Sequence, residues 1–228
     1  MHHKHSISIQ RRLLLSATVA IISGWTASPL LAAAPSHADF GNQRPSPEVR
    51  QVANSVLASG DHGRHSFVLL DKRNARVYVF DPRGRLRGAA PALLGYARGD
   101  HTVPGIGDRP IDKVLPHERT TPAGRFVAKM GTSSTRNEDV VWVDYDSAVS
   151  MHRVIKGTPK ERRAQRLASP TAADNRISYG CINLPVAFYE KILRPAVKNG
   201  GAVIYVLPET KPAHQLFPFL AAQRRTAP

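Results

Sequence analysis

The stretch Ile177–Pro185 reads ISYGCINLP and contains Cys181, the only cysteine in a chain of 228 residues. A small residue and a glycine lead into the thiol, and Pro185 opens a predicted helix. Two interpretations are open from this stretch alone. A lone cysteine can be a small, inert core residue, because free Cys is among the most buried side chains. It can also be a nucleophile, since the thiolate is reactive.

The composition predicts a globular protein with a strongly basic surface. Apolar residues make up 42% and charged residues 21% of a chain long enough to form one domain with a substantial core. The formal net charge of +15 favours polyanionic partners, such as nucleic acid, an anionic membrane surface or an acidic cell-wall polymer. No nucleic-acid-binding motif occurs, so we expect no nucleic-acid partner. The acidic and His residues between 100 and 117 match no metal-binding spacing, so we expect no metal or cofactor.

Residues 1–38 have the layout of a secretory signal peptide. Three basic residues, Lys4, Arg11 and Arg12, precede an apolar run, and small residues follow up to Ala38, after which cleavage is predicted. The alternative is an uncleaved membrane anchor, for which the apolar run is short. We therefore expect export, with only transient membrane association through this segment. In an exported protein a single cysteine indicates a free reactive thiol or an intermolecular bridge.

The pattern of apolar and turn residues after position 38 predicts a β-rich fold with a few helices. Residues 39–64 are expected to form a linker and then a packing helix that begins after Ser46 and ends at Gly60. Apolar runs separated by turn residues predict antiparallel strands at 67–70, 76–80, 121–127, 140–145, 149–152 and 202–207. A long loop is predicted over 95–116, a second helix from Pro185 with a kink at Pro195, and a peripheral tail over 209–228.

Four features in chain order resemble the L,D-transpeptidase catalytic-domain family (YkuD-like). They are a hairpin at 67–80, the turn TPAGRF at 121–126, His152 on a strand, and the motif SYGCIN at 178–183. The resemblance covers residues 65–208. It implies a mainly β, β-rich α+β catalytic domain, built as an antiparallel β-sandwich with a few short helices, and a cysteine-dependent acyltransferase activity.

The resemblance also implies roles for the residues of the motif. Cys181 and His152 would be the catalytic pair, with the imidazole either pairing with the thiolate or removing its proton as a general base. Backbone N–H groups around Gly180 and Cys181 are expected to hold the oxyanion. Ser178 is expected to hydrogen-bond the turn or the imidazole, and Asn183 to fix the loop or the substrate amide.

Three departures from the family pattern bear on substrate recognition. Arg153 stands where a small residue usually follows the histidine, and Tyr179 stands where a basic residue or histidine is common. We assign both as candidate substrate-binding residues. The spacing from His152 to Cys181 is long, so residues 156–175 are predicted to be an insertion that holds a short helix. Its basic cluster would either steer the substrate or form the solvated surface of a lid.

The stem peptides of peptidoglycan are the substrate that the resemblance implies, in the periplasm or cell wall. Cys181 would attack the carbonyl of the third stem residue, meso-diaminopimelate, and release D-alanine. An amine of a second stem, or of a wall-attached protein, would then accept the peptide from the thioester. Two alternatives remain open: water could resolve the thioester, which gives an L,D-carboxypeptidase or a hydrolase, or the protein could bind the wall without catalysis.

Overall fold

The computed structural model describes residues 37–133 and 136–221. The first 36 residues of the predicted signal peptide therefore lie outside the described part of the chain. Among the helices that are described, none combines the length and the apolar character needed to cross a bilayer.

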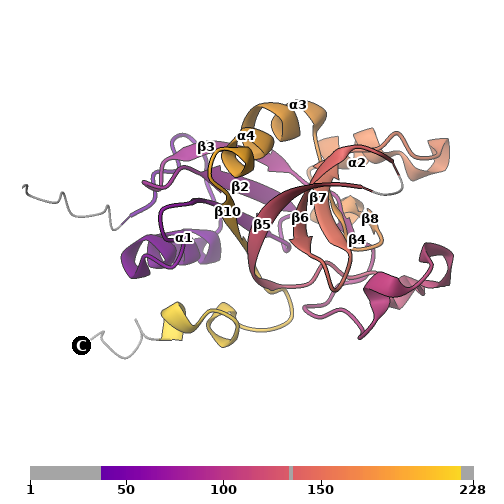
Figure 1. Cartoon of the computed structure of the whole chain (residues 1–228), viewed down its shortest axis with the longest axis horizontal. Helices are drawn as coiled ribbons and strands as arrows, with labels where there is room; N and C mark the ends of the chain where they lie inside the picture. Colours follow the sequence, from indigo (N-terminus) through magenta and orange to yellow (C-terminus); the bar gives the residue numbers. More distant parts are fainter. Residues whose placement is uncertain (1–36, 134–135, 222–228) are drawn as a thin grey trace, which may run out of the picture. The chain divides into compact units, whose positions relative to one another are not determined.

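Eight strands form one mixed sheet in the order β3-β2-β1-β10-β5-β6-β7-β9 (Figure 1). Their bounds are Ser66–Asp71 (β1), Arg76–Phe80 (β2), Leu86–Pro91 (β3), Gly124–Thr132 (β5), Asp139–Asp144 (β6), Val149–Arg153 (β7), Ile182–Leu184 (β9) and Ala202–Val206 (β10). A separate parallel pair joins β4 (Leu94–Gly95) to β8 (Arg176–Ser178). The prediction of a mainly β fold with few short helices is confirmed. Most neighbours are antiparallel, but β1–β10 and β7–β9 are parallel pairs.

The two edges of the large sheet approach each other. Leu93, which follows β3, exchanges two backbone hydrogen bonds of 2.9 Å with Asn183 of β9. The sheet is therefore nearly closed, and strand β9, which begins directly after Cys181, has partners on both sides. This fixes the position of the cysteine motif against the rest of the sheet.

The N-terminal helix has the boundaries that its capping residues predict. Helix α1 spans Pro47–Ser59, the Ser46 hydroxyl accepts a 3.3 Å hydrogen bond from the Val49 N–H, and Gly60 ends the helix in a left-handed conformation. The stretch that was expected to be a linker before it is partly core, because Phe40 is buried against Tyr78 and Phe80.

Strand β1 shows how the sheet is buried on both faces. Val68 and Leu70 belong to a cluster that includes residues of the helices after Pro185, whereas Phe67 and Leu69 belong to a second cluster that includes residues of α1. Because successive side chains alternate between faces, burial on both sides requires a continuous apolar run, which is what this strand has. The fold therefore has two cores that share one sheet.

The helix that starts after Pro185 is interrupted in its middle. It consists of α3 (Val186–Phe188), a π-helical segment (Tyr189–Leu193) and α4 (Arg194–Lys198). Pro195 lacks an N–H and cannot make the hydrogen bond of a regular helix, so the widened turn before it agrees with the predicted kink. The helix remains packed on the sheet through Phe188, Leu193 and Val197.

The C-terminal segment is not peripheral, and the sequence-based prediction is wrong for residues 209–221. Phe217 and Leu220 are buried in the cluster beneath α1, next to the short 3-10 helix Ala213–Gln215. The side chain of Glu209 is also buried and forms a 2.7 Å ion pair with Arg176. The apolar residues are spaced too irregularly for the sequence pattern to predict a helix there, but they complete this core.

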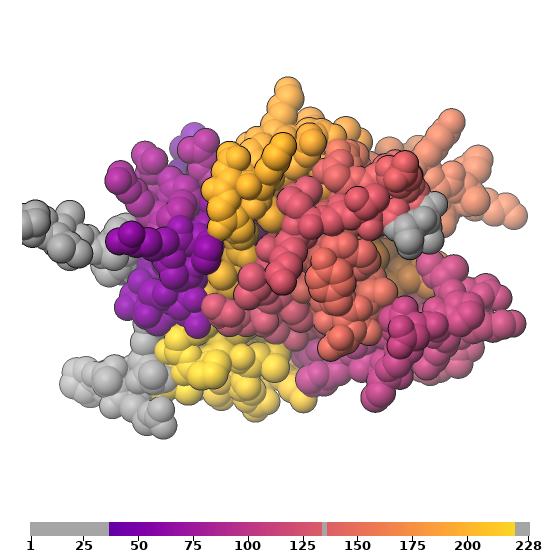
Figure 2. All heavy atoms as spheres, in the orientation of Figure 1, coloured from indigo at the N-terminus to yellow at the C-terminus, as the bar shows by residue number. Residues whose placement is uncertain are grey.

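Two irregular segments lie at the same end of the domain (Figure 2). The predicted long loop contains three 3-10 turns, Ile106–Asp108, Ile111–Lys113 and Pro116–Glu118. The predicted insertion contains the 3-10 turns Pro159–Glu161 and Ala172–Asn175 and the short helix α2 (Arg163–Ala168). Both segments contribute residues to the cavity that Cys181 lines.

Candidate active site

The pairing of β7 with β9 brings the sequence-predicted residues together. In this parallel pair Met151 lies opposite Ile182, and His152 lies opposite Asn183. Met151 and Ile182 point into the core. Because side chains alternate along a strand, His152 and Asn183 point to the other face, as does Cys181 at the entrance to β9.

Cys181 lines an open cavity. Its side chain is partly buried, and its thiol is free of any disulfide. The sulfur lies 3.7 Å from the Ser150 hydroxyl and 3.6 Å from the Ala148 carbonyl oxygen. The cavity has a volume of about 250 Å³, and His152 also lines it. The thiol is therefore accessible from this cavity, unlike that of an inert cysteine sealed in the core.

The tautomer of His152 follows from its contact with the backbone. Its Nδ1 lies 2.7 Å from the Arg153 carbonyl oxygen, which can only accept a hydrogen bond, so Nδ1 carries the proton. In the neutral ring Nε2 is then an acceptor. The Asn183 amide nitrogen lies 3.5 Å from Nε2, which is too long for a strong hydrogen bond and leaves the Nε2 lone pair available. The nitrogen that faces Asn183 is thus the one that can take up a proton.

The surroundings of His152 favour the neutral imidazole. Its pKa is lowered to about 4, chiefly by burial and to a smaller extent by the positive charges of Arg136, Arg163 and Arg153, while the hydrogen bond to the Arg153 carbonyl opposes the shift. The residue is only 3% exposed. Near neutral pH the imidazole is therefore uncharged and can act as a base.

Ser178 shapes the turn that precedes the thiol. Its hydroxyl donates a 2.6 Å hydrogen bond to the Cys181 carbonyl and accepts one of 3.1 Å from the Gly180 N–H. The expected role of the Gly180 N–H as an oxyanion donor does not fit this geometry, because the Ser178 hydroxyl already accepts that N–H. Ser178 has the turn-forming position that the sequence analysis allowed for it.

Gly180 is required by its conformation and by its neighbour. Its φ is 133°, which residues with a side chain rarely adopt, and a Cβ there would lie 2.8 Å from the Thr120 carbonyl oxygen. The backbone at Thr120 and Thr121 is thus in close contact with the turn that precedes Cys181. The buried Thr121 hydroxyl also donates a 2.8 Å hydrogen bond to the Gly180 carbonyl.

Asn183 connects three parts of the site. It is 1% exposed. Its Nδ2 lies close to His152 Nε2 and 3.4 Å from the Cys181 carbonyl, and its Oδ1 accepts a 2.7 Å hydrogen bond from Arg163. The predicted loop-fixing position of Asn183 agrees with these contacts.

Arg153 is not available to bind substrate, and this prediction is corrected. Its guanidinium bonds the Asp139 carboxylate at 2.8 Å and the Glu190 carboxylate at 2.6 Å, and it lies over the ring of Tyr189. Although burial opposes it, these two carboxylates raise the pKa of Arg153. The side chain points to the same face as Met151, where the helix after Pro185 covers it. Only its backbone carbonyl belongs to the site.

Tyr179 lies at the mouth of the cavity. It is 38% exposed, its ring contacts the guanidinium of Arg119 at 4.0 Å, and it lines the cavity together with Ile111 of the long loop. Its predicted contact with substrate is compatible with this position and stays a prediction.

Sequence reasoning missed two residues of the site. Ser150 precedes His152 by one strand period, so alternation along β7 could have predicted it. Arg163 belongs to the basic cluster that the sequence described only as steering residues or a solvated lid. In the structure its side chain is 7% exposed and lines the cavity, and no sequence signal marks it.

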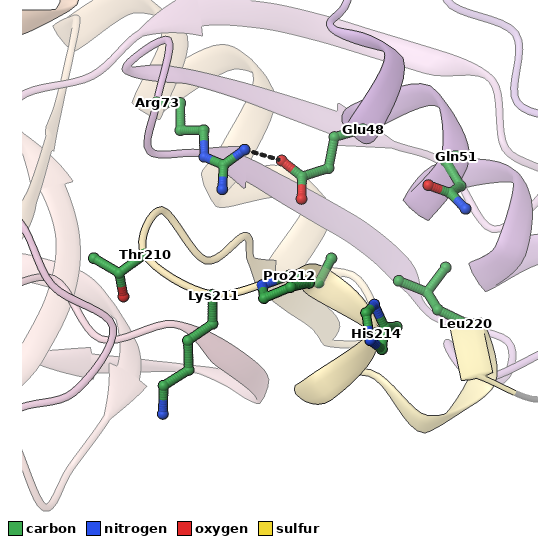
Figure 3. Close-up of a pocket in the computed structure, with 9 residues that line it drawn as sticks. Glu48, Gln51, Arg73, Thr210, Lys211, Pro212, His214 and Leu220 are labelled. Atoms are coloured by element: carbon green, nitrogen blue, oxygen red, sulfur yellow. Dashed lines mark ion pairs between the residues drawn. The ribbon is translucent and has the colours of Figure 1, made fainter.

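A larger cavity of about 390 Å³ lies between α1 and the C-terminal segment (Figure 3). Glu48 and Arg73 form a 3.5 Å ion pair at its edge, and Lys211 and His214 also line it. None of the sequence-predicted site residues is found there. Among the described residues no group of three or more His, Cys, Asp or Glu side chains is arranged to hold a metal ion.

Comparison with known proteins gives structural likeness only. No family model matches the chain, and no curated protein matches it. The chain is similar to the Ldtfm–avibactam carbamoyl enzyme, with 15% identity, a TM-score of 0.38, and coverage of 63% of this chain and 49% of the other. It is also similar to the catalytic domain of the Enterococcus faecium L,D-transpeptidase, with 17% identity, a TM-score of 0.37, and coverage of 64% of this chain and 99% of the other. A third similar structure is the L,D-transpeptidase of Xylanimonas cellulosilytica, with 14% identity, a TM-score of 0.36, and coverage of 67% of this chain and 67% of the other.

The match spans about half the length of the first of these structures. At these identities and TM-scores the likeness does not assign the chain to a family. Function therefore has to be argued from the site itself.

Proposed function

We propose that this protein is a cysteine-dependent acyltransferase of the L,D-transpeptidase type, with Cys181 as nucleophile and His152 as general base. The observation that carries the proposal is the state of the imidazole. A neutral ring whose Nε2 is unprotonated lines the same cavity as a free, accessible thiol. This arrangement favours proton removal by a neutral base over a resting pair of imidazolium and thiolate.

In the first half-reaction the Cys181 sulfur attacks the carbonyl carbon of the third residue of a peptidoglycan stem peptide. The thiol proton passes to Nε2 of His152. The carbon–nitrogen bond to the terminal D-alanine then breaks, and the amine leaves with the proton that His152 returns. The product is a thioester on Cys181, so the energy of the peptide bond is retained without a nucleotide.

The tetrahedral oxyanion of this step needs a preorganised donor. Because Ser178 accepts the Gly180 N–H, we assign this role to the backbone N–H of Cys181 itself. Ser150, whose hydroxyl contacts the sulfur, is placed to donate to the developing thiolate. Asn183 keeps the imidazole and the cysteine turn at a fixed separation through its amide.

In the second half-reaction an amine of another stem, or of a wall-attached protein, attacks the thioester carbonyl, and the sulfur leaves. Such chemistry belongs outside the cytoplasm, in the periplasm or cell wall, where the predicted signal peptide would direct the protein. The basic composition suits a substrate that is rich in carboxylates.

Product analysis tests this proposal. The purified protein is incubated with tetrapeptide stems that carry a free side-chain amine, and the products are separated by mass. A cross-linked dimer with release of D-alanine is the expected result. Tripeptide without dimer would instead indicate a carboxypeptidase or hydrolase, and unchanged tetrapeptide would favour a wall-binding protein without catalysis.

Export has its own test. The N-terminal sequence of the protein recovered from cells is expected to begin after Ala38. Recovery of a chain that still begins at Met1 would contradict cleavage and favour the anchored alternative.

A further inference from the structure

The insertion places a buried cation beside the reacting groups. Arg163, the first residue of α2, is 7% exposed, and its Nη1 donates a 2.7 Å hydrogen bond to Asn183 Oδ1. Asn183 in turn contacts His152 Nε2 and the Cys181 carbonyl. One amide side chain therefore separates this guanidinium from the base and from the nucleophile's backbone.

A buried cation requires compensation, and Glu161 provides part of it. The Glu161 carboxylate accepts hydrogen bonds from Arg163 Nε at 2.9 Å and from Nη2 at 3.3 Å. These bonds and the one to Asn183 use three of the five N–H groups of a guanidinium. Within the part of the chain that the structure describes, one N–H on each terminal nitrogen is left for a further acceptor.

The cavity as a whole carries more positive than negative charge. Among the described residues that line it, Arg136 and Arg163 face the one carboxylate of Glu161, and His152 is neutral near pH 7. Within residues 37–133 and 136–221, no other acidic side chain lines this cavity. An anion of the substrate would therefore be attracted to the end of the cavity where Arg163 lies.

We propose that Arg163, carried by the insertion, forms a carboxylate-binding subsite next to Cys181. The subsite selects donor peptides that bear a free carboxylate close to the bond that is attacked. Two carboxylates of a stem tetrapeptide fit this description, that of the terminal D-alanine and the free carboxylate of the diaminopimelate side chain. Planar, bidentate recognition of a carboxylate is what an arginine provides and a lysine does not. The identity of this ligand rests on the proposed function, but the presence of an anion-binding group beside the thiol does not.

Alkylation of Cys181 tests the subsite without requiring transpeptidation. Iodoacetate and iodoacetamide form the same carbon–sulfur bond and expel iodide, but only iodoacetate carries a carboxylate. The ratio of their rates, followed by mass spectrometry of the peptide that contains Cys181, reports the attraction of a carboxylate to the site. We expect Arg163→Gln to lower this ratio about tenfold, the loss of one charge-assisted hydrogen bond.

Two further variants separate this effect from misfolding and from general electrostatics. Lys160→Gln removes an exposed charge from the same insertion and should leave the ratio unchanged. Glu161→Gln removes the internal carboxylate and should raise the ratio, which a disordered insertion would not do. A ratio that Arg163→Gln leaves unchanged, or that Lys160→Gln lowers equally, would overturn the proposal.

Protection experiments identify the carboxylate. N-acetyl-D-alanine should slow the reaction of iodoacetamide with Cys181 in the wild type but not in Arg163→Gln, whereas N-acetyl-D-alaninamide should not protect either protein. This result assigns the subsite to the terminal D-alanine. Protection only by a stem tripeptide, and not by its side-chain carboxamide, assigns it to the diaminopimelate carboxylate. Absence of protection by every one of these carboxylates would overturn the subsite, whether or not the protein forms cross-links.

Discussion

His152 donates its Nδ1 proton to the carbonyl oxygen of the next residue, Arg153, across 2.7 Å. The arginine that follows the histidine therefore acts through its backbone, while its side chain is held by two carboxylates on the opposite face of the sheet. One residue orients the base and anchors the strand. This relationship accounts for a large side chain at a position where a small one was expected.

The folded protein should lose stability in acid through His152. Its pKa is about 4 in the folded state against 6.5 for an exposed histidine, so the unfolded chain takes up the proton first. The stabilisation is therefore complete above about pH 6.5 and is lost as the pH falls towards 4. The shift corresponds to about 3 kcal/mol. Denaturant unfolding of wild type and His152→Gln at several pH values should show a difference that shrinks through this window; a constant difference would contradict the assignment.

The same pKa predicts the acidic limb of the rate profile. If neutral His152 removes the thiol proton, acylation of Cys181 should persist well below pH 6.5 and fail only near pH 4, where the imidazole becomes charged. His152→Gln should lower the rate by about 10²- to 10⁴-fold. Single-turnover acylation measured between pH 4 and 8 checks this. A limb near pH 6.5 would mean that the ring is as accessible to water as a surface histidine.

The Thr121 hydroxyl should stabilise the turn that precedes Cys181. Its hydroxyl accepts a 2.9 Å hydrogen bond from the Gly95 N–H and donates one of 2.8 Å to the Gly180 carbonyl. Thr121→Val leaves both buried partners unsatisfied and should cost about 1–3 kcal/mol of stability and slow alkylation of Cys181. Thr120→Val is the matched control, because the Thr120 hydroxyl bonds His101 and not the turn. Equal effects of the two variants on alkylation would argue against a specific role.

Gly180→Ala should disturb the turn through a collision as well as through backbone strain. The added Cβ would lie 2.8 Å from the Thr120 carbonyl. Gly200 is a suitable comparison, since its φ of 128° is similar to the 133° of Gly180 and its added Cβ meets nothing within 4 Å. Strain of this kind costs about 1–3 kcal/mol in either variant. Gly180→Ala should exceed Gly200→Ala in the loss of stability, measured by denaturant unfolding, and it alone should lower the reactivity of Cys181.

Arg153→Gln should weaken the fold and not substrate recognition. Its loss leaves Asp139 and Glu190 paired only with the more exposed Arg194 and removes the contact with Tyr189, which we expect to cost about 1–2 kcal/mol. The ratio of iodoacetate to iodoacetamide reactivity at Cys181 should stay at the wild-type value. A fall in that ratio comparable to that of Arg163→Gln would return Arg153 to the substrate site.

Local signals account for the elements that the sequence predicted well. The cap at Ser46, the stop at Gly60 and the apolar runs of the strands depend on neighbouring residues, so helix α1 and the first hairpin follow from them. Alternation along residues 149–153 would also have separated His152 from Arg153, because adjacent strand residues face opposite sides. The prediction that the side chains of His152 and Arg153 both belong to the site is inconsistent with this alternation.

Other features depend on contacts between distant parts of the chain. The burial of Phe217 in a core beneath α1 requires the sheet to be in place first. Similarly, the sequence gives no reason to distinguish Arg163 from the exposed basic residues around it. Its burial depends on hydrogen bonds to Asn183 and Glu161, which only the folded structure brings together. The parallel pairing of β7 with β9, which brings His152 to the cysteine motif, joins segments separated by the whole insertion.

Mass spectrometry of the intact protein after mixing with a stem tetrapeptide tests the central claim most directly. The proposal predicts a transient adduct of the tripeptide acyl group, located on the peptide that contains Cys181, with one D-alanine released per adduct. Neither should form with Cys181→Ala. Release of D-alanine by Cys181→Ala at the wild-type rate, or an adduct on any other residue, would contradict nucleophilic catalysis by this thiol.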